Sequence, residues 1–432
     1  MRLRKPVFGA LFQCDAAVAT VDILMPSGKN AWDLIKVNAV TGVYPSFLTD
    51  IPFQKQCCES AGIEVNRCFV MHLNSRFVRN GEMDAQELLI KTDVTEKVAG
   101  KSSEVREQKD RMCEIIANPN CPELDVVNEC SQFSGGCPLY GECWSFLPEK
   151  DCIDALVAGS LSVDYFSKIL SLIRKGIMSI HDLPDDFPLG RRASIQREAV
   201  LTQRPHVDKS AIETFLSCLS FPQYYLKLDE FTAVVPLYNM MHPFESVPFH
   251  FSLHILRSYD SEPEHIEFLA TEETDPRREL IAALKESIKP EGMLVTEFGF
   301  EAGRLRKSVE AFPEYRSFVE GLISRSIGLN SLFNDFHYYH PDQQGTVSLC
   351  SLLPVLVPDF PLDNMEKGRV SINEYARVTF GDCSPQERLH DVLTVFSLVQ
   401  GERGEDTAST FNYVCSAQSL VKKTVCAYAT GY

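Results

Sequence analysis

The chain has 432 residues, of which 44% are hydrophobic and 23% are charged, and its formal net charge is −17. This is an ordinary globular composition, and the length allows two or three hydrophobic cores. The acidic balance excludes a protein that coats nucleic acid through bulk electrostatics, because neutralising phosphates requires clustered Lys and Arg. No apolar run approaches the roughly 20 residues that span a bilayer. The sequence after Met1 lacks the apolar core of a signal peptide, so we expect a cytoplasmic protein with no membrane contact.

The predicted elements of the first 118 residues are mainly strands. Two strands are predicted over residues 19–25 and 32–40, which flank the turn signal PSGKN, and a buried strand is predicted over residues 68–74. A helix over residues 51–63 should end at Gly62, and one long polar helix is predicted over residues 92–118. This order indicates a mixed α/β module.

A cysteine-rich loop follows from Cys121 to Cys152, and a helical connector runs through residues 165–177 to the proline-rich segment 182–190. A second α/β unit then begins, with strands around Leu226 and over residues 249–256 and 293–300, and a helix over residues 275–288. We therefore divide the chain into residues 1–152, 153–204 and 205–400, with a tail at 401–432 that shows no motif.

Fifteen cysteines is a high number, but it is odd, and most cysteines stand in apolar contexts such as RCFVM around Cys68. This pattern predicts reduced, buried thiols rather than a disulfide framework.

The segment 190–204, GRRASIQREAVLTQR, is the best local candidate for contact with nucleic acid. Its basic residues are Arg191, Arg192, Arg197 and Arg204. A solvated helix face is the simpler interpretation of this charge run.

A series of motifs follows, in order, the pattern of a large bacterial family of uncharacterised proteins, domain of unknown function 2779. The motifs occupy residues 62–84, 165–184, 224–255, 267–277, 300–305, 311–315 and 333–359, for example FEAGRL at 300–305 and FNDFHYYHP at 333–341. The resemblance covers roughly residues 8–400. Members of this family resemble a RecB-type nuclease with an iron–sulfur loop, as in CRISPR-associated exonucleases, joined to a ribonuclease-H-like 3′–5′ exonuclease domain.

The resemblance implies an α/β fold in three parts. The first is a RecB-like, restriction-endonuclease-type α/β module, shortened at its amino terminus; a helical connector and a ribonuclease-H-like α/β domain follow. It also implies two carboxylate sites that use Mg²⁺ or Mn²⁺ to cut DNA or RNA. Such sites need paired acids, because these cations take oxygen ligands.

At the first of these sites the resemblance implies catalytic roles for Asp22 and Gln54. Lys36, however, stands where the family has glutamate, and Asn38 stands where it has lysine. One carboxylate facing one lysine makes an ion pair rather than a metal site. Asp33 falls on the opposite strand face by the two-residue period, so it is no substitute, and we expect this site to be inactive.

At the second site the family's aspartate–apolar–glutamate motif aligns with Lys227, Leu228 and Asp229. A shifted alignment uses Asp229 and Glu230, but adjacent strand residues face opposite ways and could share a metal only across a bulge. An ammonium group in a metal-binding position repels the cation that the family binds there.

The other acids of the second site are only partly retained. Glu301 keeps the second motif, whereas Phe298 replaces the family's asparagine, and Gly328 and Gln400 stand where aspartates are expected. Too few carboxylates remain for two metal ions.

The loop NECSQFSGGCPLYGECW offers Cys130, Cys137 and Cys143, which match the family's three closely placed cluster ligands. Relatives take the fourth ligand from a segment before the nuclease strands. Here Cys121, Cys152 or Cys14 could replace it. A [4Fe–4S] cluster, a zinc ion and a metal-free loop remain the three alternatives.

Three histidines, His254, His337 and His340, also invite metal interpretations, but the motifs that hold them favour structural hydrogen bonds. Asp275 and Pro276 are predicted to begin a helix, with Asp275 as its cap.

The leading hypothesis is a nuclease-family protein with degenerate active sites, retained as a nucleic-acid or protein binding module, or the product of a split or decaying gene. The alternative is an active Mg²⁺- or Mn²⁺-dependent DNA or RNA exonuclease that uses Asp229, Glu230 and Glu301. A third interpretation is a structural protein whose partner supplies the amino-terminal segment, which predicts an exposed apolar surface where that segment would pack.

Overall fold

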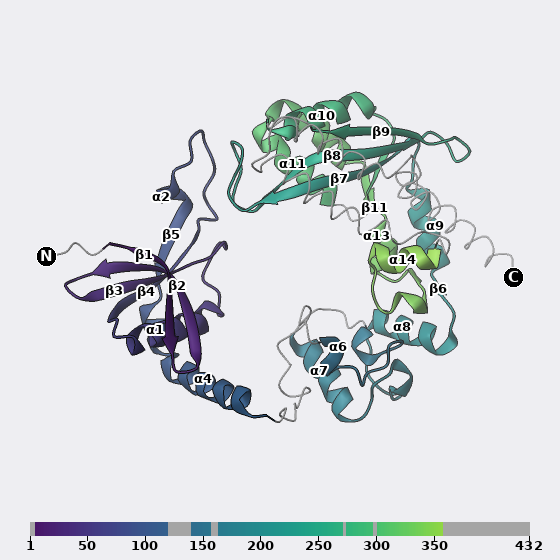
Figure 1. Cartoon of the computed structure of the whole chain (residues 1–432). Helices are drawn as coiled ribbons and strands as arrows, with labels where there is room; N and C mark the ends of the chain where they lie inside the picture. The colour runs from purple at the N-terminus through teal and green to yellow at the C-terminus, as the bar shows by residue number, and fades with distance from the viewer. Residues whose placement is uncertain (1–4, 120–139, 157–162, 271–273, 297–299, 357–432) are drawn as a thin grey trace. The chain divides into compact units, whose positions relative to one another are not determined.

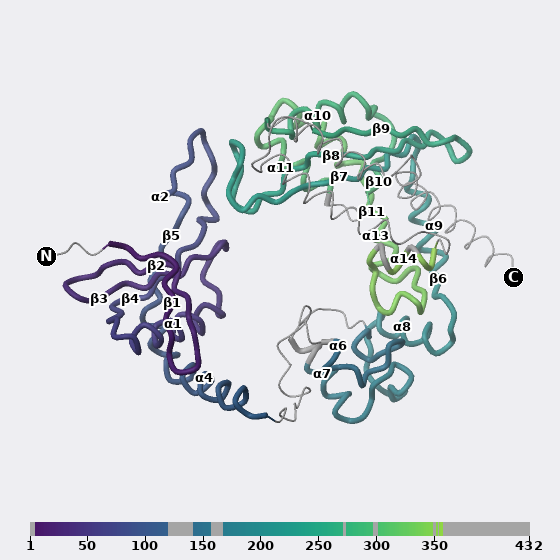
Figure 2. Tube along the Cα trace, in the orientation of Figure 1, coloured from purple at the N-terminus to yellow at the C-terminus, as the bar shows by residue number. Residues whose placement is uncertain are grey.

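The computed structural model describes residues 5–119, 140–156, 163–270, 274–296 and 300–356. Figures 1 and 2 colour them by residue number, from purple at the N-terminus to yellow. The chain divides into two compact units. The first comprises Met1–Glu123 and Thr232–Glu245, and the second comprises Leu124–Phe231 and Ser246–Tyr432. Phe298, Gln400, the tail 401–432, and Cys121, Cys130 and Cys137 lie outside the described residues. Within the described part, no helix has the length and apolar character needed to cross a membrane.

The first unit is built on a five-stranded sheet with the strand order β1-β2-β3-β4-β5. Its strands are β1 Val7–Cys14, β2 Ala17–Ser27, β3 Ala31–Val37, β4 Val65–Leu73 and β5 Leu89–Asp93. Neighbouring strands are antiparallel except β3 and β4, which run parallel because helix α1 (Phe47–Ser60) carries the chain across between them.

One face of this sheet carries the core. Side chains such as Val21, Leu34 and Val70 pack there against Ile51 and Cys58 of α1. Helix α1 stops where predicted, since Gly62 takes φ +80° and its N–H bonds to Glu59 O at 3.0 Å.

The single long helix predicted over residues 92–118 is wrong. The chain instead finishes β5 and forms two helices, α3 Thr95–Ala99 and α4 Ser102–Ala117. Asp93 caps the turn by accepting from Thr95 N at 2.9 Å, and Gly100 interrupts the helical run. A short helix, α2 Ala85–Leu88, precedes β5.

The connector forms short helices around a small core. They are α6 Tyr140–Cys143, α7 Val163–Arg174 and α8 Arg191–Thr202, with single-turn 3₁₀ segments at Ile153–Ala155 and Ile180–Asp182. Trp144, Ile153, Leu170, Ile180 and Val200 meet in this core.

The second unit contains a five-stranded sheet with the order β11-β10-β7-β8-β9. Its strands are β7 Gln223–Ala233, β8 Glu245–Leu256, β9 Glu264–Leu269, β10 Met293–Thr296 and β11 Ser326–Gly328. Strand β10 runs parallel to both β7 and β11, whereas β8 and β9 run antiparallel to each other. A separate two-stranded sheet pairs β6 His206–Val207 with β12 Tyr338–Tyr339.

Helices cover both faces of the second sheet. Leu226, Leu228 and Leu253 on one face share a core with α10 Pro276–Ser287, α11 Phe300–Ala311 and α12 Arg316–Ile323, of which α10 and α11 are labelled in Figure 1. Tyr225 and Val295 on the other face pack with α9 Lys209–Ser217, α13 Asn330–Asn334 and α14 Leu349–Leu356. The predicted start of α10 is confirmed, because Asp275 Oδ1 accepts from Arg277 N at 3.1 Å and Pro276 opens the helix.

Candidate functional sites

The first candidate site lies where β2, β3 and α1 meet. Asp22 on β2 accepts the N–H of Val37 at 2.7 Å, so its carboxylate lies beside the end of β3. Lys36 on β3 forms an ion pair with Asp50 of α1, Nζ to Oδ2, at 3.1 Å. Gln54, one turn further along α1, donates from Nε2 to Thr20 O on β2 at 2.9 Å. The fold therefore brings Asp22, Lys36 and Gln54 to one region.

The charged side chains of this first site are already bound to other groups of the protein. The ammonium of Lys36 is neutralised by Asp50, and Asp22 is bound by a backbone donor. Asp33 points away from these groups and instead accepts from Asn66 at 3.2 Å and from Arg67 at 3.4 Å, as the two-residue period predicts. No group of three potential metal ligands forms among the residues that the structure describes.

The second candidate site is centred on Asp229 of β7. Its Oδ2 lies 2.8 Å from Nδ1 of His250 on β8, and its Oδ1 lies 3.7 Å from Nζ of Lys227. His250 reaches a second carboxylate as well, with Nε2 2.9 Å from Oε1 of Glu267 on β9. Three neighbouring strands are thus joined by a carboxylate–imidazole–carboxylate chain with a lysine at one end.

Asp229 and His250 shift each other's pKa values. Burial alone would raise the pKa of Asp229, but the ammonium of Lys227 and the hydrogen bond from His250 lower that pKa to about 2. Burial would lower the pKa of His250, whose side chain is 2% exposed, yet its hydrogen bonds to Asp229 and Glu267 raise that pKa above its usual value. Asp229 is therefore an ionised carboxylate in contact with the ammonium of Lys227 and the imidazole of His250.

Glu230 and Glu301 lie on the other side of β7, toward α11. Glu230 Oε2 is 2.6 Å from Nε of Arg304 on α11. Burial raises the pKa of Glu230, and burial together with the charge of Glu230 raises the pKa of Glu301. Glu301 is 6% exposed, and its Oε2 has no hydrogen-bond partner within the described ranges. Asp229 and Glu230 thus face opposite ways, as expected for adjacent strand residues.

His250, Glu267 and Arg304 are the residues of this site that sequence reasoning missed. A signal for His250 exists in FHFSLHIL, because the two-residue period places His250, Ser252 and His254 on one strand face. Arg304 follows Glu301 by three residues, which is the spacing of neighbours on a helix surface. The pairing of β8 with β9 that supplies Glu267 has no local signal.

The three histidines singled out in the sequence all contact other protein groups. His254 stacks on His265 with ring centroids 4.2 Å apart, and burial lowers the pKa of His254 to about 3. His337 Nδ1 is 3.2 Å from Asp208 Oδ2, and His340 Nδ1 accepts from Asp342 N at 3.2 Å. These contacts favour the structural interpretation over the metal one.

Of the three loop cysteines proposed as cluster ligands, only Cys143 lies within the described residues, at the end of α6 beside Trp144. Cys152 is buried, and burial raises the pKa of its thiol to about 12, which disfavours the thiolate that a metal requires. Cys14 contacts Ser60, with Sγ 3.2 Å from Oγ. Among the described candidates, Cys143 therefore fits a metal ligand better than Cys152 does.

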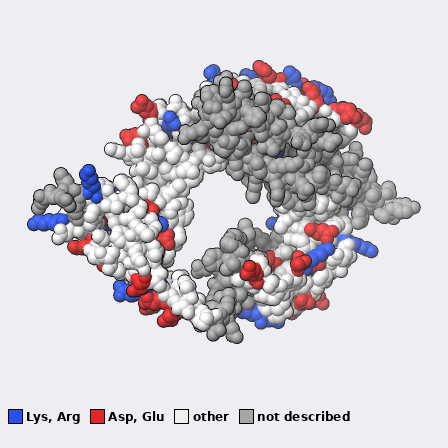
Figure 3. Space-filling model, in the orientation of Figure 1, with Lys and Arg blue, Asp and Glu red and all other residues white. Residues whose placement is uncertain are grey.

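The basic segment of helix α8 is engaged in contacts within the protein. Arg191 donates to Asp335 O at 2.5 Å, Arg192 lies over the ring of Phe336 at 4.7 Å, and Arg197 donates to Asp185 at 2.8 Å. On the face shown in Figure 3, acidic and basic residues are interspersed over the coloured surface. Three of the four arginines of the segment 190–204 therefore already contact groups within the protein.

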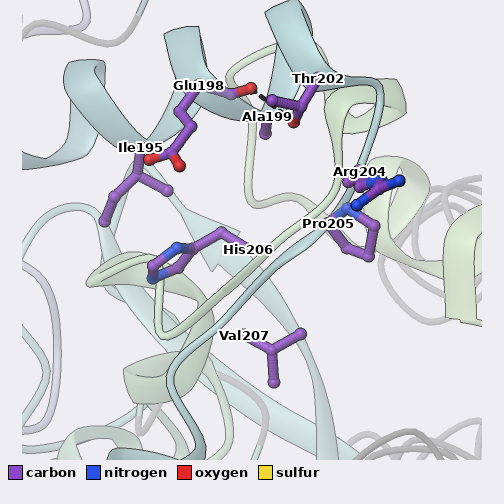
Figure 4. A pocket seen from close by; sticks show the side chains of 8 residues that line it. All are labelled: Ile195, Glu198, Ala199, Thr202, Arg204, Pro205, His206 and Val207. Atoms are coloured by element: carbon purple, nitrogen blue, oxygen red, sulfur yellow. Dashed lines mark hydrogen bonds between the residues drawn. The ribbon is translucent and has the colours of Figure 1, made fainter. Parts of the chain in front are cut away.

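A cavity of about 540 Å³ lies beside α8, where the chain continues into β6. Figure 4 shows Glu198 and His206 on one side of it and Arg204 on the other. Burial and the nearby charge of Arg191 lower the pKa of His206. The cavity is thus lined by a carboxylate, a guanidinium and an imidazole that favours its neutral form.

One comparison with known proteins gave a match. Residues 224–348 match the family described as Domain of unknown function (DUF2779). Comparisons with curated proteins and with solved structures found no match. The resemblance over residues 8–223 and 349–400 stays a prediction. The matched segment begins at Tyr224 in β7 and carries the whole second candidate site, which therefore lies in a domain similar to this uncharacterised family.

Proposed function

We propose that the chain is a nuclease-like protein whose carboxylate sites no longer bind catalytic metal ions and that it acts as a binding module. The observation that carries this proposal is the pairing of Asp229 with Lys227 and His250. A Mg²⁺ or Mn²⁺ ion bound to Asp229 would have to displace the Lys227 ammonium and the His250 imidazole, which already contact this carboxylate.

The strand arrangement of the second sheet supports a ribonuclease-H-like domain. Numbered within the domain, its strand order is 3-2-1-4-5, and the central first strand is parallel to the fourth. In such a domain the acids of the first strand and of the segment after the fourth would meet at one site. Here Glu230 and Glu301 lie near each other, but Asp229 lies on the opposite face.

The first sheet supports a RecB-like module. The support is its arrangement of three antiparallel strands, a crossing helix and a fourth strand parallel to the third, in which Asp22, Lys36 and Gln54 come from β2, β3 and α1. The ion pair of Lys36 with Asp50 occupies the position where a second metal-binding acid would be expected. Both proposed sites therefore carry an internal cation where the family would bind a metal ion.

A protein partner fits this module better than a nucleic acid does. The net charge is −17, and three of the four arginines in the best basic segment bind groups within the protein. Phosphate binding needs basic side chains that are free to replace counterions. Binding of single-stranded DNA or RNA, measured by fluorescence anisotropy at low salt, would instead favour a nucleic acid as the partner of this module.

A second candidate function is an active Mg²⁺- or Mn²⁺-dependent exonuclease. Glu301 favours it, because a buried carboxylate with an unpartnered oxygen and a raised pKa is a group that a bound cation would stabilise. Glu230 would be its neighbouring ligand and Asp229 the third, provided that β7 rearranges. This candidate requires the Arg304–Glu230 pair to open.

A nuclease assay separates the two functions. The full chain is incubated with end-labelled single-stranded DNA and RNA, with Mg²⁺ or Mn²⁺, beside Glu301→Ala and the control Glu310→Ala. Glu310 is an exposed acid on the same helix. We expect no trimming above background from any of the three proteins. Trimming that Glu301→Ala abolishes and Glu310→Ala preserves would establish the exonuclease.

The cysteine loop is proposed to hold a [4Fe–4S] cluster through Cys130, Cys137 and Cys143, with Cys121 as the fourth ligand. The spacing of the first three in a glycine-containing loop supports this proposal, and a zinc ion is the alternative. Anaerobic purification should give a brown, iron- and sulfide-containing protein. The colour should be lost in Cys137→Ser and kept in Cys218→Ser, which changes an exposed cysteine of α9's C-terminal cap. A colourless protein with zinc, or with no metal, would overturn the cluster.

A further inference from the structure

The free edge of the first sheet exposes large apolar side chains. β1 is the last strand in the order β1-β2-β3-β4-β5, so no strand of the described part pairs with its outer side. Phe8 and Leu11 on β1 are each 70% exposed, and Val18 on the neighbouring strand is 54% exposed. An edge strand with exposed apolar residues is a template for pairing with another chain.

Two of these exposed residues, Leu11 and Val18, lie on the face of the sheet that α1 leaves open. Ala10 and Phe12 pack against the core that Ile51 of α1 shares. Leu11 stands between them and pairs in register with Thr20, which is exposed as well. Since successive strand residues point to opposite faces, Leu11 belongs to the open face.

The backbone of β1 limits how this edge can be used. Gly9 takes φ +60° and has no partner in the register with β2, so the ladder is regular only from Ala10 to Cys14. A short regular edge suits one closed pairing better than an extended fibre.

The charges at the two ends of β1 identify the partner. Lys5 precedes the strand and Asp15 follows it, and both are exposed. Asp15 is bound by Lys109 at 2.9 Å, but its side chain remains 77% exposed. A second β1 in antiparallel orientation would bring Lys5 of each copy beside Asp15 of the other, whereas a parallel one would place like charges together.

We propose that β1 is the interface of a homodimer in which the β1 strands of two copies pair antiparallel about a two-fold axis. The pairing satisfies the free backbone groups of the edge, brings the exposed Leu11 side chains of both copies together on the open face, and forms two symmetry-related Lys5–Asp15 pairs. An isologous contact of this kind closes on itself.

The test is the mass of the full chain in solution, measured by sedimentation equilibrium over a range of micromolar concentrations. Wild type should be a dimer. Leu11→Asp places two like charges in the interface and should weaken dimerisation at least hundredfold, and Phe8→Glu is the second variant should the first fail to fold. Ile90→Asp, at a 39% exposed residue on the opposite edge strand β5, is the matched control and should remain a dimer. Circular dichroism establishes that each variant is folded.

Three results would overturn the interface: a monomeric wild type, a dimer that survives both β1 substitutions, or a dimer that Ile90→Asp dissolves. The orientation is tested by Lys5→Glu, which places two acids beside each other at each end. We expect it to weaken the dimer roughly tenfold at low salt, because two exposed ion pairs are lost. An unchanged dissociation constant would rule out the antiparallel arrangement.

Discussion

Nδ1 of His250 lies 2.8 Å from Oδ2 of Asp229, which joins the imidazole of one strand to the carboxylate of the next near the centre of the second sheet. The other ring nitrogen of His250 contacts Glu267, so one side chain compensates two carboxylates. The Lys227 ammonium and the His250 imidazole, both supplied by the protein itself, thus already contact the Asp229 carboxylate.

Removal of His250 should therefore be costly. His250→Ala leaves Asp229 and Glu267 partly buried without their shared partner, and breaking such a buried pair costs about 3–5 kcal/mol. Urea denaturation should show this loss in the free energy of unfolding. Ser252→Ala, on the same face of β8, should cost about 1 kcal/mol or less because it removes one neutral hydrogen bond to His265. Equal effects of the two substitutions would contradict the central position of His250.

Stability should fall as the pH drops below about 6.5, the usual pKa of histidine. The pKa of His254 is lowered to about 3 by burial and by His265, so between these values the unfolded chain binds a proton that the folded protein does not. The free energy of unfolding should then decrease by up to about 1.4 kcal/mol per pH unit from this residue. His250, whose pKa is raised, is protonated in both states below 6.5 and adds no slope there.

Urea denaturation from pH 4.5 to pH 6, compared between wild type and His254→Gln, isolates this contribution. The variant should show the smaller slope. Identical slopes would mean that His254 is protonated in the folded protein.

Arg304 should matter more than its neighbour Arg306. Arg304→Ala removes the cation paired with Glu230 and leaves that partly buried carboxylate beside Glu301, which should cost about 1–3 kcal/mol of unfolding free energy. Arg306 pairs with Glu320 at 3.0 Å on the exposed surface, so Arg306→Ala should produce no measurable change. Thermal denaturation checks this: the midpoint of Arg304→Ala should lie below that of Arg306→Ala. The reverse order would be inconsistent with a buried Glu230–Arg304 pair.

Introducing an acid at residue 227 should create a site that binds a divalent metal ion. Lys227→Asp would place a second carboxylate on the strand face of Asp229, because residues two apart share a face. We expect Mn²⁺ to raise the thermal midpoint of this variant and to leave that of Lys227→Ala unchanged. The same Mn²⁺ response in both variants would show that the ion binds elsewhere.

Much of the local structure could be predicted from the sequence, since its signals are local. The end of α1 at Gly62, the cap of α10 at Asp275 and the opposite directions of Asp229 and Glu230 each follow from a few neighbouring residues. The interruption at Gly100 was missed because the polar pattern continues on both sides of it.

The composition of the second site could not be predicted in the same way. The contact of His250 with Glu267 depends on the register of β8 with β9, in which Ser252 pairs with Glu267. The pairing of Arg304 with Glu230 depends on how α11 packs on β7, across more than 70 residues of sequence. Such contacts arise from long-range packing, for which a single sequence contains no periodic signal.

A calorimetric titration of the full chain with Mn²⁺, beside Glu301→Ala, tests most directly whether the second site binds a metal ion. We predict that wild type and Glu301→Ala give the same binding curve, because Lys227, His250 and Arg304 already compensate the acids at the second site. Saturable binding to wild type that Glu301→Ala abolishes would contradict this and would identify a working metal centre.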